Sequence, residues 1–121
     1  MTNVDKAIKA LRDKRSRQGE LNRQAGYRFE NQVYQFLKRN KKTYLDVFNS
    51  SGSRGIADLR AWKADGTEII ISCKTNGYWT EKELIELRSM KERYSKAKYG
   101  KREFYLAYYI TKKKWTMRTF K

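Results

Sequence analysis

The sequence contains no histidine and only one cysteine, Cys73. Zinc sites built from Cys and His are therefore excluded, and so is any mechanism that needs a histidine base, such as a Ser-His-Asp triad. A single cysteine also excludes a disulfide within the chain. If the protein is an enzyme, its chemistry has to come from carboxylates, lysine, hydroxyl groups and a hard metal ion.

Long apolar segments are missing as well. No apolar run approaches the length of roughly 20 residues that spans a bilayer, so we expect no membrane-spanning segment. The 121 residues are enough for one domain with a small hydrophobic core.

Acidic residues are scarce. The chain has 13 Asp and Glu against 29 Lys and Arg, a formal net charge of +16. Because so high a net charge makes a folded domain repel itself, we expect the protein to bind a polyanion. Ribosomal or membrane-surface association is the alternative. Nucleic acid is the leading partner class, and we expect no membrane partner.

The hydrophobic pattern predicts one α/β domain behind a basic arm. Residues 1–22 form the arm, which is weakly helical and interrupted at Gly19. Residues 23–121 form the main domain. A helix over 25–39 carries a stripe of apolar residues that faces the core. A second helix starts after Thr80, a good N-cap. Strands are expected at 44–48, 56–62, 68–74, 104–110 and 115–120, with a hairpin turn at 64–66.

These elements predict a central mixed five-stranded sheet flanked by helices. The three consecutive isoleucines at 69–71 indicate a strand that is buried on both faces. We expect the aromatic residues of the last two strands to lie in the core or at a dimer interface.

Three side chains could carry phosphodiester chemistry. Asp58 follows a loop rich in Ser and Gly, in a strand, where Asp is otherwise rare. Lys74 ends the next strand, which a tight hairpin brings to about 4.8 Å. Glu30 flanks the apolar stripe of the first helix. Two carboxylates can hold Mg²⁺ or Mn²⁺, which activates a water, while a lysine stabilises charge on the phosphate.

Taken in order, the motifs resemble those of the archaeal-type Holliday-junction resolvases of the restriction-endonuclease-like nuclease superfamily. The resemblance covers residues 25–120. Its elements are Gly26-x-x-x-Glu30 at the start of a helix, Ser53-Arg54-Gly55 before Asp58, Cys73-Lys74 at a strand end, and a closing hairpin with Trp115.

The resemblance implies a restriction-endonuclease-like core and a homodimer that makes paired nicks in four-way DNA junctions with Mg²⁺ (or Mn²⁺). No small-molecule cofactor is implied. An intracellular protein of a prokaryote, or of a virus that infects one, is expected. By the same resemblance Glu30, Asp58 and Lys74 are catalytic, Asp58 and Glu30 hold the metal with the backbone carbonyl of Cys73, and Ser53 is the active-site loop serine.

One position departs from the family pattern. Ser72 stands where the family has a metal-binding glutamate, two residues before the lysine. The site could use Ser72 as a weak metal ligand and catalytic residue, with Glu30 or water completing the metal shell. The chain could instead be an inactive relative that only binds junctions, or carry a substitution. A restriction or repair endonuclease and a non-catalytic DNA- or RNA-binding protein are the rival functions.

Basic and aromatic residues outside the core are candidate DNA contacts. The lysine runs can be read as solvated turns, but the net charge favours phosphate contacts. Tyr78 and its neighbour Trp79 could equally contact DNA or a partner subunit. The expected DNA-binding residues are Arg23, Arg28, Lys41, Lys42, Arg54, Tyr78, Lys112, Lys113 and Lys114.

Overall fold

The computed structural model describes residues 2–49, 56–96 and 100–121 of the chain. Within these residues the elements are α1 (Asn3–Arg39), β1 (Tyr44–Asn49), β2 (Leu59–Lys63), β3 (Glu68–Cys73), α2 (Glu81–Ser95), β4 (Arg102–Tyr109) and β5 (Trp115–Thr119). The strands form one sheet in the order β1-β2-β3-β4-β5. Only β3 and β4 pair in parallel, with α2 as their crossover, so the predicted mixed five-stranded α/β sheet is confirmed.

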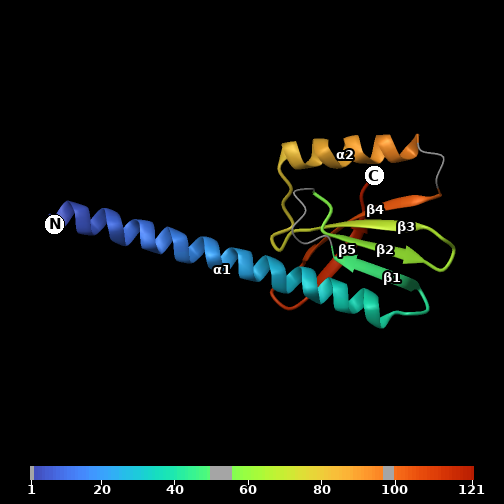
Figure 1. Cartoon of the computed structure of the whole chain (residues 1–121), viewed down its shortest axis with the longest axis horizontal. Coiled ribbons are helices and arrows are strands. Elements are labelled where there is room, and N and C mark those ends of the chain that lie inside the picture. Colours follow the sequence, from blue (N-terminus) through green and yellow to red (C-terminus); the bar gives the residue numbers. More distant parts are fainter. Residues whose placement is uncertain (1, 50–55, 97–99) are drawn as a thin grey trace.

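The sheet lies between the two helices (Figure 1). Alternate residues of β3 supply both cores, because successive side chains of a strand point to opposite faces. Ile69 and Ile71 belong to the cluster around Phe29 of α1, whereas Ile70 packs in the cluster around Leu87 of α2. All three isoleucines are buried, which confirms the prediction of a strand covered on both faces.

The first helix is longer than predicted, and the expected break at Gly19 is wrong. α1 runs without interruption for 37 residues, about 55 Å at 1.5 Å per residue, and projects far beyond the sheet (Figure 1). A glycine inside a helix costs about 1 kcal/mol relative to alanine, which neighbouring residues that form helices well can offset. No helix in the described part of the chain is long and apolar enough to cross a membrane.

Strand β2 begins later than the predicted residue 56. The Asp58 N–H donates to the carbonyl of Ile71 at 2.9 Å, and the Asp58 carboxylate accepts the N–H of Cys73 at 2.7 Å. A side chain thus takes a position that a backbone carbonyl would hold in a regular ladder, and β2 starts only at Leu59. The predicted hairpin turn after β2 is confirmed, with Gly66 at a φ of 89°.

Candidate functional site

The predicted acidic residues lie together at one end of the sheet. At this end β1, β3 and β4 finish and β2 begins, because β1–β2 and β2–β3 are antiparallel and β3–β4 is parallel. Asp58 precedes β2 and Cys73 closes β3, so the two are neighbours. Glu30 of α1 reaches the same place and hydrogen-bonds to Asp58. Helix and sheet therefore bring together two carboxylates that are 28 residues apart in sequence.

The contact between Glu30 and Asp58 changes their affinity for protons. Burial raises the pKa of Glu30 to about 7, and the charge of Asp58 and the hydrogen bond between the two groups add to the rise. Burial also raises the pKa of Asp58, against the effects of the Cys73 N–H, the hydrogen bond with Glu30 and the charge of Lys74. Two carboxylates in contact do not both ionise readily, so Glu30 keeps its proton close to neutral pH.

A divalent cation would relieve this repulsion. Mg²⁺ is commonly held by one or two carboxylates together with waters and substrate phosphates, and the Glu30–Asp58 pair supplies oxygen ligands of that kind. Among the described residues, no group of three His, Cys, Asp or Glu side chains is placed to hold a metal ion. The fit therefore rests on the two carboxylates and on the strand end at Cys73.

Cys73 is a structural neighbour of this pair. Burial, followed by the charges of Asp58 and Glu30, raises the pKa of its thiol far above the ordinary value. The thiol therefore stays protonated and does not act as a nucleophile, because the thiolate is the reactive form. Its N–H, held by Asp58, fixes the strand end whose carbonyl is the expected metal ligand.

Lys74 has a partner that the sequence did not indicate. Its Nζ lies 2.5 Å from Oε2 of Glu83, in the first turn of α2. Burial would raise the pKa of Glu83, but the hydrogen bonds from Lys74 and Thr80 lower it below the ordinary value. The charge of Lys74 lowers the pKa of Asp58 and the charge of Glu83 raises it, so Lys74 lies within electrostatic range of Asp58.

Ser72 is not part of the cluster of acidic side chains. Its side chain is 1% exposed and lies on the face of β3 that α2 covers, the same face as Ile70. The Ser72 hydroxyl accepts the indole N–H of Trp79 at 2.9 Å. Trp79 is buried and packs edge-on against Tyr108, so its predicted alternative role in DNA contact does not fit its position. The structure thus uses Ser72 to anchor the loop before α2.

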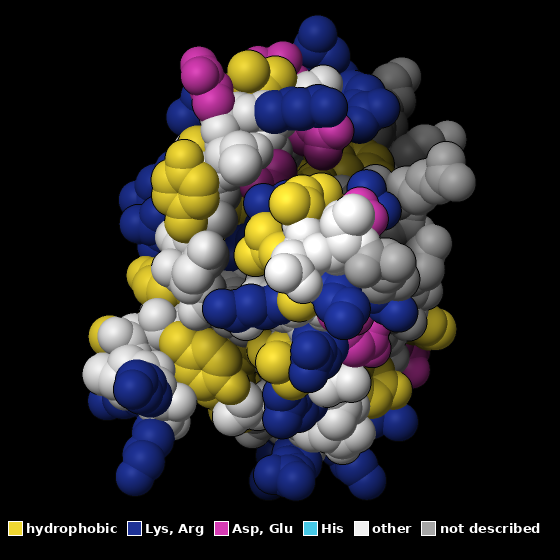
Figure 2. All heavy atoms as spheres, turned by 90° about the vertical axis from the view of Figure 1, so that its left-hand side faces the viewer, with side chains coloured by type: hydrophobic (Ala, Val, Ile, Leu, Met, Phe, Trp, Pro, Cys, Tyr) yellow, Lys and Arg dark blue, Asp and Glu magenta, His cyan; other side chains and the backbone are white. Residues whose placement is uncertain are grey.

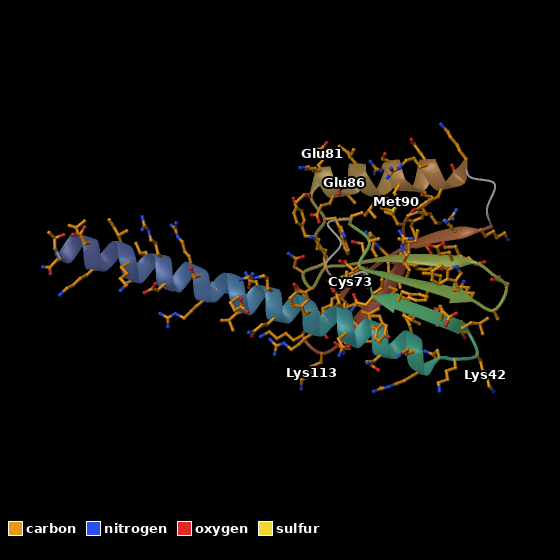
Figure 3. All side chains as sticks on the ribbon, in the orientation of Figure 1. Lys42, Cys73, Glu81, Glu86, Met90 and Lys113 are labelled. Atoms are coloured by element: carbon orange, nitrogen blue, oxygen red, sulfur yellow. The ribbon has the colours of Figure 1, made fainter. Side chains whose placement is uncertain are left out.

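The other predicted site residues that the structure describes lie at both ends of the sheet and on α1. Ser53 and Arg54 fall outside the described residues. Lys112, Lys113 and Lys114 are exposed in the turn between β4 and β5, at the same end of the sheet as Cys73; Figure 3 labels Lys113 and Cys73. Tyr78 is exposed in the loop after β3. Lys41 and Lys42 lie at the opposite end of the sheet, after α1 (Figure 3), so they are not brought to the acidic pair.

Arg23 and Arg28 are exposed on α1. Arg23 pairs with Glu20 at 2.8 Å, and the Arg28 side chain donates to the carbonyl of Gln24. Arg23 precedes Glu30 by seven residues, nearly two full turns, and so lies on the same side of the helix. Figure 2 views this end of the molecule from the N-terminal side of α1, with Lys and Arg side chains over much of the face.

Sequence reasoning missed Glu83 and the bond between Trp79 and Ser72. The sequence does contain a local signal for the position of Glu83, because Thr80-x-x-Glu83 is a capping box, and both of its hydrogen bonds are present. Nothing in the pattern links that box to Lys74, since the pairing depends on how α2 returns over the sheet.

Comparison with protein families, with curated proteins and with solved structures finds no match for this chain.

The raised pKa of Glu30 predicts a pH-dependent gain in stability for Glu30→Gln. From the ordinary pKa of 4.5 to about 7, the folded protein keeps a proton that the unfolded chain releases. Stability of the wild type therefore falls as pH rises through this window. After allowing for solvent screening of a partly exposed group, we expect Glu30→Gln to be more stable by about 1 kcal/mol at pH 8, with little difference at pH 4.5.

Urea unfolding at the two pH values measures this effect. Glu86→Gln, an exposed change of the same kind on α2, serves as the control and should show no such pH dependence. A Glu30→Gln variant that is less stable at pH 8 would contradict the proposed repulsion.

Proposed function

We propose that this protein is a metal-dependent DNA endonuclease that cuts branched DNA, specifically four-way junctions, as a homodimer. The observation that carries the proposal is the contact between Glu30 and Asp58 at one end of the sheet, with Lys74 close enough to lower the pKa of Asp58. Two carboxylates and a lysine, without histidine, are a suitable set for hydrolysis of a phosphodiester through a hard metal ion.

The residues have separate roles in this proposal. Asp58 and Glu30, with the carbonyl of Cys73, would hold Mg²⁺ or Mn²⁺, which supplies charge neutralisation and an acidified water when bound. Asp58 is kept in place by the Cys73 N–H at 2.7 Å. Lys74 donates hydrogen bonds to the phosphate and stabilises the charge that develops on it.

The arm formed by α1 supports a nucleic acid as substrate. Residues 2–24 are all exposed and contain seven Lys and Arg against three Asp and Glu. Arg12, Arg23 and Glu30 are eleven and seven residues apart, close to whole turns, so they follow one side of the helix. A phosphate backbone lying along this side would lead directly to the acidic pair. The lysines of the β4–β5 turn border the same end of the sheet.

The choice of a junction and of a dimer rests on the motif resemblance. A four-way junction is resolved by two symmetric cuts, which two active sites related by a twofold axis can make. A restriction or repair endonuclease with the same chemistry would instead prefer a linear duplex.

Cleavage of a labelled four-way junction tests the proposal. A linear duplex with the same arm sequences is cut in parallel, each in Mg²⁺, in Mn²⁺ and in EDTA. We expect paired nicks in the junction that need the metal, with little cutting of the duplex. Preferential cutting of the duplex would favour the restriction or repair function.

A second candidate, a non-catalytic DNA-binding protein, is favoured by two observations. Ser72 is buried under Trp79, and the described residues contain no group of three metal-binding side chains. This candidate predicts tight junction binding that weakens steeply with salt, and no cleavage in either metal.

A further inference from the structure

The carboxylate of Glu83 makes two sets of contacts at once. Oε1 accepts the backbone N–H of Thr80 at 3.0 Å, and the Glu83 N–H donates to the Thr80 hydroxyl at 3.2 Å. Oε2 lies 2.5 Å from Nζ of Lys74. The capping box at the start of α2 therefore fixes the orientation of Glu83, and Glu83 in turn holds the lysine.

The segment that carries Glu83 is itself attached to β3. Trp79 is 6% exposed, and its indole N–H donates to Ser72, two residues before Lys74. The loop thus contacts the end of β3 at two points, through Trp79 with Ser72 and through Glu83 with Lys74. The first contact is buried and directional, so it sets the position of the second.

Without such a partner, the side chain of a lysine at a strand end would not stay in one position. Its long stem loses about 2 kcal/mol of rotamer entropy when it is held in one position. β3 offers Lys74 no nearby carboxylate, because its one acidic residue, Glu68, lies at the other end of the strand and pairs with Arg60 and Arg102. The carboxylate that orders Lys74 comes from α2 instead.

We propose that Glu83 is a positioning residue, which holds the ammonium group of Lys74 beside Asp58 in the place where it meets the scissile phosphate. This inference rests on the proposed nuclease function and extends it to a residue outside the expected motif. The Ser72–Trp79 contact keeps the helix start that presents Glu83 in register with the strand end.

Glu83→Gln is the informative variant, because glutamine is also accepted at this position of a capping box. It removes the charge that holds Lys74 and leaves the helix start intact. Glu81→Gln is the matched control, since Glu81 lies in the same turn, is exposed, and brings the same change in net charge (Figure 3).

Two measurements separate positioning from a structural role. In single-turnover cleavage of the junction, we expect Glu83→Gln to be about 10- to 100-fold slower than Glu81→Gln, with junction affinity equal in the two variants. In NMR of the DNA-free protein, the two Hε protons of Lys74 should have separate shifts in the wild type. These shifts should merge in Glu83→Gln, because an unrestrained side chain changes rotamer rapidly.

Each outcome decides a different point. If the wild type cuts and both variants cut equally fast, Glu83 does not position Lys74 and the inference is wrong. A loss of junction affinity equal to the loss of rate would make Glu83 a structural residue. A wild type that is inert in both metals overturns the proposed function, and with it the catalytic consequence of the pairing, whatever the NMR spectra report.

Discussion

Replacing Asp58 with asparagine is expected to abolish cleavage and to leave DNA binding intact. Asparagine has nearly the same shape, and its carbonyl oxygen can still accept the N–H of Cys73 that Asp58 now accepts. The substitution removes the negative charge that would hold the metal. Losing about 4 kcal/mol of transition-state stabilisation corresponds to a rate about 10³-fold lower.

Single-turnover cleavage and junction binding are measured on the same preparation. Asp46→Asn, an exposed change of the same type on β1, should cut and bind like the wild type. Because burial raises the pKa of Asp58, the Asp58→Asn variant should be at least as stable as the wild type at pH 8. Cleavage within threefold of the wild-type rate would remove Asp58 from the proposed mechanism.

The second large effect is expected at Ser72, where the resolvases that the motifs resemble have a glutamate. Ser72→Glu should lower the free energy of unfolding by about 3 kcal/mol or more, because it places a carboxylate in an apolar environment and displaces the indole of Trp79. For a domain of this size such a loss corresponds to a melting temperature roughly 10–20 °C lower. Introducing a glutamate at position 72 is therefore expected to harm the fold rather than to raise activity.

Urea unfolding with Trp fluorescence measures this effect. Ser72→Ala removes only the hydroxyl that Trp79 uses and should cost about 1–2 kcal/mol. The difference between the two variants isolates the cost of the charge. A Ser72→Glu protein that is as stable as the wild type and cuts junctions faster would mean that position 72 opens toward the acidic pair, and that Trp79 is easily displaced.

Much of the sheet could be predicted because its signals are local. The isoleucines of β3, the turn at Gly66 and the Thr80 cap each depend on neighbouring residues, and the structure has all three. The boundary of β2 and the length of α1 could not be predicted in the same way. Asp58 replaces a ladder contact with its side chain, and glycine in α1 weakens a helix without ending it.

The candidate site was predicted in part. The proximity of Asp58 to the end of β3 follows from a tight hairpin, which fixes both strand spacing and register. The approach of Glu30 required only that the apolar stripe of α1 face the sheet. The partner of Lys74 could not be predicted in this way, because Glu83 belongs to α2, the helix that connects the parallel strands β3 and β4.

By itself, the sequence determined which residue types are present for chemistry: it has no histidine, one cysteine, few acidic residues and a net charge of +16. It also determined the class of fold, since hydrophobic periodicity is a local property that sets each element and its buried face. Only the tertiary structure decided that Glu30 hydrogen-bonds to Asp58, that Ser72 lies under Trp79, and that Glu83 holds Lys74. These contacts join residues from different elements, and their geometry exists only once α1 and α2 have packed on opposite faces of the sheet.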